Sequence, residues 1–428
     1  MPFLPHSLHR LIPKTGSHFS GRCYRAFMPH RLSPKTGSHF SGRCYRAFMP
    51  HRLSPKTGSH FSGRCYGPSP AIALLWLMAL ALVPTPVAQA TEPPHGSARA
   101  CGPSAQESLL EPASGVDDSL ALDCRASLSG QDLVTKELVF EGEKASGAGI
   151  DCHGGTIGIP GHVPKSAPPT ITIRSEPQED GGWSVPHDIH IRNCKIYGSI
   201  VIMGMGGNGE AEAVRLSSLT PGHTARAQMA APHHIVIDNV TLVAAGPVPL
   251  YLAPGVHHVE FSHSIVTGHS KNTALYLDAE SGQNVITGNR FEIGTRNREV
   301  IAVDGSAHNV ISANSFVEPA GGGVFLYRNC GQGGTIRHQT PQYNQITGNH
   351  FLYREGAPSH PAIWLGSSSI GQALYCYQDP SLPFGSGADN RSFADFNTVT
   401  GNDITGAGSE TIRDAGASNT VGDNRFKP

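Results

Sequence analysis

A short motif recurs through the C-terminal part of this chain. Its clearest copy, at residues 284–291, reads NVITGNRF. Close copies begin at Asn309, Asn344, Asn397 and Asn419, and looser ones begin at Ile189 and Ile235. Most copies lie about two dozen residues apart, and β-branched residues alternate with polar residues inside them. A repeat of this length, with Gly and Asn at its turns, predicts a β-solenoid whose coils bury their apolar sides against one another.

The asparagine near the end of each copy is predicted to line up from coil to coil. The aligned residues are Asn193, Asn239, Asn289, Asn314, Asn349, Asn402 and Asn424, with His263 in the slot between Asn239 and Asn289. Asparagine tolerates the left-handed backbone of a tight corner, and its amide can bond to the same amide one coil away. The two long gaps, before Asn349 and before Asn402, predict one coil plus an insertion each. Insertions on a solenoid usually build one face.

These repeats resemble the right-handed parallel β-helix proteins of the pectate-lyase-like superfamily over roughly residues 133–426. The resemblance implies an all-β, right-handed parallel β-helix with an N-terminal cap and inserted loops. It also implies a polysaccharide as the partner, in a superfamily that contains polysaccharide lyases, mannuronan epimerases and some glycosidases. The catalytic motifs of mannuronan epimerases, pectate lyases and polygalacturonases have no match here, so the candidate residues below come from the strand pattern alone.

Three segments precede the coils. Residues 1–70 hold 21-residue repeats with eleven of the 32 Lys and Arg residues and none of the 33 Asp and Glu residues, and are predicted to be disordered or to precede the true start. Residues 71–90 combine an apolar run with a small-residue cleavage site and are predicted to be a signal peptide. We interpret residues 91–130 as a linker and cap, and residues 131–428 as the β-helix.

A signal peptide predicts a secreted or periplasmic protein. We expect a monomer that binds no nucleic acid and has no membrane contact beyond the signal peptide. Six cysteines follow that peptide, and an even number in an exported chain predicts disulfides. Fifteen pairings are possible, and the preferred set is Cys101 with Cys124, Cys152 with Cys194, and Cys330 with Cys376.

No metal site built from cysteine or histidine is predicted, because no paired-cysteine or spaced-histidine zinc motif is present. Two adjacent histidine pairs, His233 with His234 and His257 with His258, each stand immediately before a strand of the repeat. We interpret both pairs as structural turn residues.

Five strands that precede the asparagine corners alternate in phase from Leu250 onward. Their outward side chains form an aromatic column, Tyr251, Tyr276, Ala302, Phe325 and Trp364, and a second column, Ala253, Asp278, Asp304, Tyr327 and Gly366. Outward aromatic residues predict a covering loop or a bound ligand. The predicted substrate-binding residues are Tyr251, Tyr276, Phe325 and Trp364, with Lys271 and Arg298 from the preceding turns.

A polar group beside the aromatic column supplies candidate catalytic residues. Cleavage of a uronic-acid polymer by proton abstraction requires a cation against the carboxylate and a base near the sugar carbon. Arg328 would neutralise the carboxylate, His338 would take the proton, and Tyr327 would protonate the leaving oxygen. Asp278 and Asp304 lie on neighbouring coils about 5 Å apart, so they would instead hold calcium or serve as the carboxylate pair of a hydrolase.

Three functions therefore remain open: a lyase or epimerase, which we rank first, a non-catalytic polysaccharide-binding protein, and an inverting glycoside hydrolase. Residues 265–354 hold seven basic and six acidic residues, so no strongly cationic groove is predicted. An enzyme requires Tyr327, Arg328, His338 and one of the two aspartates to converge in an open groove. Inserted loops that fill this groove would count against catalysis.

Overall fold

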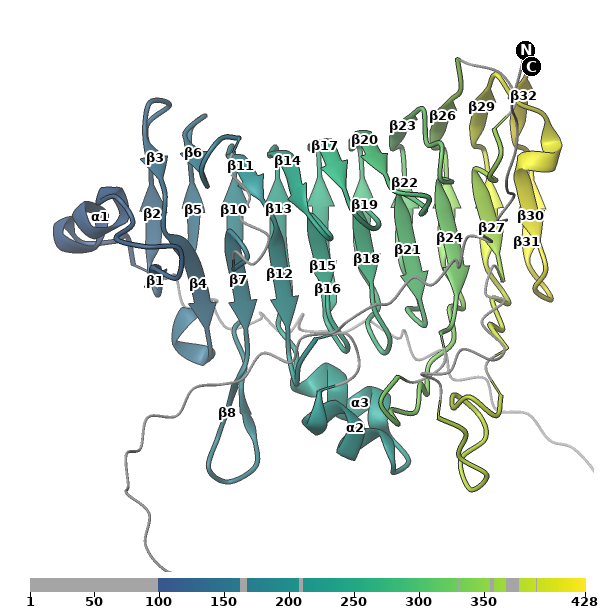
Figure 1. The fold of residues 1–428 in the computed structure, drawn as a ribbon, viewed down its shortest axis with the longest axis horizontal. Coiled ribbons are helices and arrows are strands. Elements are labelled where there is room, and N and C mark those ends of the chain that lie inside the picture. Colours follow the sequence, from purple (N-terminus) through teal and green to yellow (C-terminus); the bar gives the residue numbers. More distant parts are fainter. Residues whose placement is uncertain are drawn as a thin grey trace, which may run out of the picture. The chain divides into compact units, whose positions relative to one another are not determined.

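The computed structural model describes residues 99–161, 168–207, 211–329, 332–354, 358–366, 377–389 and 391–428. The basic repeats, the predicted signal peptide and the cysteines Cys330 and Cys376 lie outside the described residues. The described chain winds into coils that build three parallel sheets of ten strands each (Figure 1). This architecture confirms the predicted all-β parallel β-helix.

Each coil contributes one strand to each sheet. Sheet 1 contains β1 (Ser119–Ala121), β4 (Glu137–Glu141), β7 (Ile171–Arg174), β12 (Ile200–Met203), β15 (Leu250–Leu252), β18 (Leu275–Leu277), β21 (Ile301–Asp304), β24 (Val324–Tyr327), β27 (Ile363–Leu365) and β30 (Ile412–Asp414). Sheet 2 contains β2 (Arg125–Ser127), β5 (Gly149–Asp151), β10 (His190–Arg192), β13 (His233–Asp238), β16 (His257–Ser262), β19 (Val285–Thr287), β22 (Val310–Ser312), β25 (Gln345–Thr347), β28 (Thr398–Thr400) and β31 (Thr420–Gly422). Sheet 3 contains β3 (Leu133–Val134), β6 (Thr156–Ile157), β11 (Lys195–Gly198), β14 (Thr241–Gly246), β17 (Ile265–Ser270), β20 (Arg290–Thr295), β23 (Ser315–Val317), β26 (His350–Leu352), β29 (Asp403–Thr405) and β32 (Arg425–Lys427).

The N-terminal end of the coils is covered by α1 (Pro103–Leu110), which buries Leu109 in the core. The disulfide between Cys101 and Cys124 joins this segment to the first coil, and a second disulfide joins Cys152 to Cys194. Both are predicted pairs. The first coil begins at β1, inside the segment interpreted as linker and cap. Within the described residues, no helix has the length and apolarity needed to cross a membrane.

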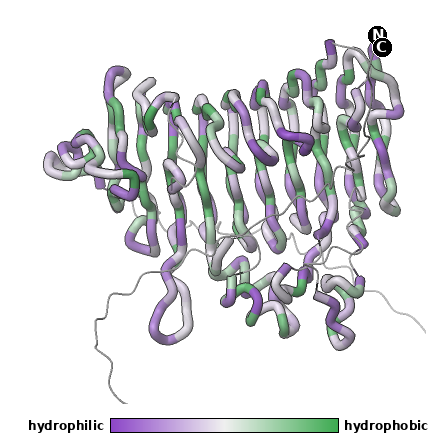
Figure 2. The backbone as a smooth tube through the Cα atoms, viewed as in Figure 1, coloured by the Kyte–Doolittle hydropathy of each residue, from purple (hydrophilic) through white to green (hydrophobic). Residues whose placement is uncertain are grey.

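The core lies inside the coils, because every second side chain of a strand points inward. Hydrophobic residues concentrate on the strands, as Figure 2 shows. The inward residues of sheet 1 stack in the predicted register and are at most 1% exposed: Leu250, Leu275, Ile301, Val324 and Ile363, then Leu252, Leu277, Val303, Leu326 and Leu365. Phenylalanine rings stack beside them, with the Phe316 and Phe351 centroids 4.5 Å apart.

Two buried asparagine ladders run through the last five coils. One contains Asn284, Asn309, Asn344, Asn397 and Asn419, and the other contains Asn289, Asn314, Asn349, Asn402 and Asn424. Each side-chain amide donates to the side-chain oxygen of the next coil, as between Asn314 and Asn349 at 3.0 Å. The predicted amide ladder is therefore present. It satisfies polar groups that the core would otherwise leave unpaired.

The predicted alignment of this ladder needs one correction. In the regular coils the left-handed residue precedes the buried asparagine, as Gly288 (φ 66°) precedes Asn289. Asn193, Asn239 and His263 occupy this left-handed slot, so Ser264 is the residue aligned with Asn289, whose oxygen accepts from the Ser264 N–H at 2.9 Å. In the regular coils one residue adopts the left-handed corner conformation, and the next residue is the asparagine whose amide pairs with the neighbouring coil.

Insertions follow strands of sheet 1 and precede strands of sheet 2, so they lie along one edge of the coils (Figure 1). They are the hairpin β8 (Glu176–Pro177) and β9 (Trp183–Ser184), the helices α2 (Glu212–Ser218) and α3 (His223–Met229), and the described residues of the segments 328–344 and 366–397. Two 3₁₀ turns, Glu143–Ala145 and Ser409–Thr411, complete the described elements. The inserted segments face the C-terminal ends of the sheet 1 strands, where the candidate catalytic residues lie.

Candidate functional site

The aromatic column is present on the outer face of sheet 1. Tyr251, Tyr276, Ala302, Phe325 and Trp364 are in register on successive coils. Tyr251, Tyr276 and Trp364 are half-buried, whereas Phe325 is 7% exposed and Ala302 is fully buried. The middle of the column is therefore covered, and rings toward both of its ends remain partly accessible.

The acidic column beside it is buried under an inserted segment. Asp278 and Asp304 are 1% and 0% exposed. Arg337 of the 328–344 segment reaches both: its Nη1 lies 2.8 Å from Asp278 Oδ1 and 3.3 Å from Asp304 Oδ2. The hydroxyls of Tyr251 and Tyr276 donate to Asp278 and Asp304, at 2.6 Å each. Asn329 donates its backbone N–H and its side-chain amide to Asp304, and the Ala279 N–H donates to Asp278, all at 2.8 Å.

Burial controls the electrostatics of this cluster. It raises the pKa of Asp304, an effect that the Arg337 charge opposes and the Asp278 charge reinforces. Burial also raises the pKa of the Tyr276 phenol well above its ordinary value. A buried charge pair that loses one partner is strongly destabilised, so a sugar could reach these carboxylates only by displacing Arg337 at a high cost. The arrangement favours a structural role for Asp278 and Asp304 over the hydrolase pair or the calcium site.

Tyr327 is also engaged within the fold. Its hydroxyl donates to Glu299 Oε1 at 2.6 Å and accepts from Arg298 Nη2 at 2.8 Å. Arg298 also pairs with Glu299 at 2.9 Å and donates to Asn272 Oδ1 at 2.9 Å. Burial, followed by the Glu299 charge, raises the pKa of Tyr327 well above its ordinary value. The Arg298 side chain is 35% exposed and is the part of this group that solvent reaches.

Arg328 and His338 point to different inserted segments. Arg328 is fully buried with its guanidinium 4.1 Å from the centre of the Phe384 ring, and it donates to the Asp389 carbonyl at 3.0 Å. Burial lowers the pKa of Arg328 to about 10. The His338 Nε2 donates to the Ser218 carbonyl at 2.7 Å, at the end of α2. Tyr327, Arg328 and His338 therefore do not converge, and each holds a different part of the fold in place.

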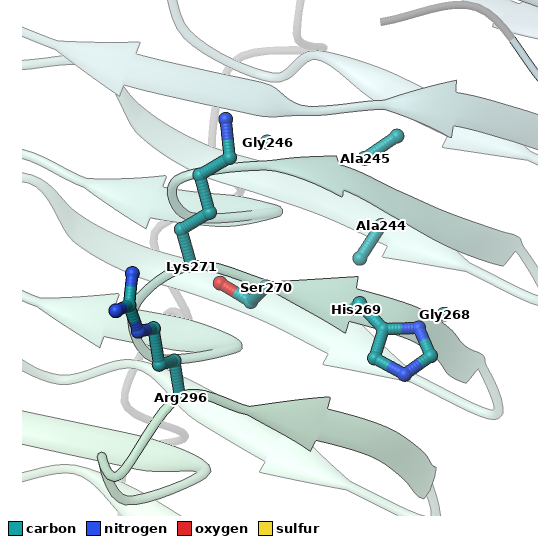
Figure 3. Close-up of a pocket in the computed structure, with 8 residues that line it drawn as sticks. All are labelled: Ala244, Ala245, Gly246, Gly268, His269, Ser270, Lys271 and Arg296. Carbon is teal, nitrogen blue, oxygen red and sulfur yellow. The ribbon is translucent and has the colours of Figure 1, made fainter. Parts of the chain in front are cut away.

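A shallow hollow of about 410 Å³ lies where the strands of sheet 3 turn toward sheet 1 (Figure 3). Residues of β14 and β17 line it, together with Lys271 and Arg296 of the turns that follow β17 and β20. Both cationic side chains are exposed, and Figure 3 shows them on the same side of the hollow, with His269 at the other end. Neither forms an ion pair with another described residue. The turn from Lys271 leads directly to Tyr276 of the aromatic column.

No protein-family model matches this chain, and no curated protein sequence does. Several solved structures share its general architecture at low similarity. A lacto-N-biosidase of family GH136 from Eubacterium ramulus is 9% identical, with a TM-score of 0.33 over 69% of this chain and 51% of its own. An alginate lyase from Paenibacillus sp. str. FPU-7 is 11% identical, with a TM-score of 0.31 over 75% of this chain and 96% of its own. The mannuronan C-5 epimerase A-module of Azotobacter vinelandii is 13% identical, with a TM-score of 0.34 over 74% and 88%.

The fold is a parallel β-helix. The three ten-stranded sheets of the chain itself establish this, because similarity at these TM-scores carries no argument about the site. This chain spans about half the length of the lacto-N-biosidase. The β-helix fold therefore explains where the candidate residues lie, but it does not indicate which activity they have.

Two groups in this region were absent from the predicted site. Arg337 stands in a glycine-rich segment, and nothing in the local pattern indicates that it crosses to two strands of sheet 1. Arg296 follows strand β20 just as Lys271 follows strand β17. Because the two strands pair on neighbouring coils, this shared position could have indicated from the sequence that the two cations lie close together. Of the predicted substrate-binding residues, Lys271, Arg298, Tyr251, Tyr276 and Trp364 remain partly or fully accessible, whereas Phe325 is covered.

Proposed function

We propose that this protein is an exported, polysaccharide-acting β-helix protein that binds an acidic glycan along the turns between sheet 3 and sheet 1. The observation that carries the proposal is the exposed pair Lys271 and Arg296, which form no ion pair with a described carboxylate. The turn that begins at Lys271 leads to Tyr276, whose side chain is partly exposed. Sugar carboxylates form charge-assisted hydrogen bonds with such cations. Sugar rings pack their apolar faces on aromatic side chains such as Tyr276. The two disulfides support export, because disulfides persist in oxidising compartments.

We rank glycan binding above glycan cleavage, because the predicted catalytic side chains Arg328 and His338 are hydrogen-bonded to backbone carbonyls of the fold. Arg328 donates to loop carbonyls, and His338 donates to the carbonyl of Ser218 in α2.

One contact favours a second candidate function, a lyase or epimerase. The partly exposed Tyr276 donates its hydroxyl proton to Asp304 at 2.6 Å, and this carboxylate would orient the phenol if Tyr276 exchanges a proton with the sugar.

The test is a binding titration of the full chain with a polyuronate and with a neutral glucan. Removing the Lys271 charge by Lys271→Ala should weaken polyuronate binding about tenfold, since a charge-assisted hydrogen bond contributes roughly 1.5–3 kcal/mol. Lys427→Ala is the matched control, because Lys427 is an exposed lysine on the last strand of the same sheet. This control should leave the affinity within about twofold.

The same samples decide between binding and cleavage. Unsaturated ends, followed by their ultraviolet absorbance, should stay absent if the protein only binds. Tyr343, an exposed tyrosine of the 328–344 segment, provides the control. If unsaturated ends form, and Tyr276→Phe abolishes them while Tyr343→Phe does not, the lyase candidate replaces simple recognition. Equal affinity of Lys271→Ala and the unaltered protein, or no binding to any acidic glycan, would refute the proposed site.

A further inference from the structure

A second hollow lies where sheet 2 turns into sheet 3, at a corner of the coils that carries neither the insertions nor the Lys271 hollow. Its volume is about 560 Å³, within the range of roughly 300–1,000 Å³ that is typical of small-molecule sites. Three successive coils line it, the first with His153 and Gly154, the second with Asn193 and Lys195, and the third with Asn239 and Thr241. Among the described residues, Lys195 is the only Lys, Arg, Asp or Glu in this lining.

The corner residue of these early coils carries a polar side chain that the later coils lack. The left-handed corner position holds Asn193, Asn239 and His263 in three successive coils, and then Gly288, Ala313, Gly348 and Gly401 in the next four. His153, with φ 44°, lies in the wider corner of the coil before Asn193. Glycine adopts this backbone without steric strain, so the turn itself does not require imidazole or amide side chains here.

The two asparagines form a row on the surface, unlike the buried ladders of the later coils. Asn239 Nδ2 donates to Asn193 Oδ1 at 2.7 Å, and Asn193 Nδ2 donates to Asp151 Oδ1 at 2.9 Å. Asn239 is exposed and Asn193 is half-buried, so the row satisfies no polar group of the core. These bonds fix the orientation of both amides. Each amide keeps a second N–H, and the Asn239 Oδ1 accepts no hydrogen bond from another described residue.

His153 adds a hydrogen-bond acceptor at one end of the row. Its Nδ1 lies 3.0 Å from the Leu128 carbonyl oxygen, which can only accept, so Nδ1 carries the proton of the neutral ring. The Nε2 atom is then an acceptor, and the His153 side chain is 59% exposed. The hollow therefore presents donors from Lys195 and the amides together with acceptors from Asn239 and His153.

The charges around the hollow balance one another. Asp151, Arg192 and Asp238 follow one another on neighbouring strands of sheet 2, and Lys195 stands on the sheet 3 side. Two carboxylates and two cations leave no net charge to attract a polyanion. The lining therefore favours a ligand that carries hydroxyl groups and no charge.

We propose that this hollow is a second carbohydrate site and that it binds a neutral oligosaccharide through the hydroxyl groups of its sugars. Each hydroxyl both donates and accepts a hydrogen bond, which matches the mixed groups of Asn193, Asn239 and His153. Neighbouring coils are about 4.8 Å apart, so a glycan that runs along the coil axis reaches both amides. Gly154 lets the ligand approach the backbone closely. The site is separate from the acidic-glycan site at Lys271 and does not depend on it.

The test is a calorimetric titration of the full chain at pH 7 with cellohexaose, xylohexaose and mannohexaose. The variant Asn193→Gly with Asn239→Gly removes both amides and introduces the residue that later coils have at the same corner, so the fold should be retained. Thermal unfolding checks this. Asp423→Gly is the matched control, because Asp423 is the exposed corner residue of the last coil, with φ 55°. Lys195→Ala is a second variant, which removes an exposed side chain outside the amide row.

The unaltered protein and Asp423→Gly should bind at least one hexasaccharide with the same affinity. The double variant should bind it at least tenfold more weakly, and Lys195→Ala about threefold more weakly, because hydrogen bonds to the sugar are lost. The double variant should keep its affinity for a polyuronate. No binding of any hexasaccharide to the unaltered protein would overturn the proposal, as would unchanged affinity in both variants. Loss of polyuronate binding in the double variant would assign the hollow to the acidic glycan and overturn the proposal as well.

Discussion

At the scale of single residues, Arg337 links the inserted 328–344 segment to sheet 1. Its side chain is 4% exposed, and the two carboxylates that it contacts are exposed by 2% or less. Removing one partner of a buried ion pair leaves the other charge without compensation in a medium that solvates it poorly. Arg337 therefore joins the inserted segment to the outer face of sheet 1 through a buried ion pair.

Arg337→Met should lower the free energy of unfolding by about 3–5 kcal/mol, because Asp278 and Asp304 then remain buried without a cation. Urea denaturation at pH 7 measures this change. Adding Asp278→Asn and Asp304→Asn to the Arg337→Met background should restore part of the loss. Arg296→Met is the control, since this exposed arginine should change stability by less than about 0.5 kcal/mol. A loss below 1 kcal/mol for Arg337→Met would show that the cluster is not structural.

At the scale of elements, α2 and α3 cover part of the site edge and hold a buried histidine between them. His223 is 1% exposed, and its Nδ1 lies 3.0 Å from the Ser217 hydroxyl. Burial, followed by the charges of His338 and Arg226, lowers the pKa of His223 to about 4. The folded state therefore binds a proton less readily than the unfolded state, whose histidine has a pKa of about 6.5.

This difference predicts acid sensitivity of the helical insertion. Between pH of about 6.5 and about 4 the unfolded state binds more protons, so stability should fall as the pH falls through this window and lose nothing further from His223 below it. The loss amounts to at most about 3 kcal/mol. His223→Gln should lose less stability across the same window in thermal unfolding experiments. Parallel pH profiles for the two proteins would contradict the prediction.

At the scale of the whole molecule, a solenoid coil contacts only its neighbours, so local changes should stay local. The disulfide between Cys152 and Cys194 joins coils across 42 residues, and the one between Cys101 and Cys124 joins the α1 segment to the first coil across 23 residues. Both lie at the N-terminal end of the described chain. The later coils contain the asparagine ladders.

Replacing Cys152 and Cys194 by serine should cost about 2–4 kcal/mol, because the unfolded chain regains the freedom of a long loop. Hydrogen exchange should quicken in the coils up to about β13, whereas the ladder around Asn314 and Asn349 should keep its protection. A uniform increase along the chain would show that the coils unfold as a single unit. The predicted pair Cys330 with Cys376 remains a prediction, and so does the monomeric state.

The repeat by itself determined the coil and the phase of its strands, and the preferred cysteine pairing was right for the two disulfides of the described residues. Alternation fixes which side chains point inward, and a constant period stacks them, so the alignment of Leu250, Leu275 and Ile301 followed from local pattern alone. The same pattern placed Tyr276 and Asp304 outward. The same pattern wrongly placed the left-handed corner at the buried asparagine, whereas the structure has it one residue earlier, as at Gly288 before Asn289. The corner residue and the paired asparagine recur with the same period, so the period alone does not distinguish them.

Only the tertiary structure decided what covers the outer face. Arg337 and Arg328 stand in irregular segments with no period, so their partners depend on long-range packing that no local pattern encodes. The histidine pairs, His233 with His234 and His257 with His258, are a further case, since their rings stack only because the coil spacing sets one pair beside the next. Periodic segments constrain themselves through their neighbours, whereas inserted segments are fixed by the surface onto which they fold.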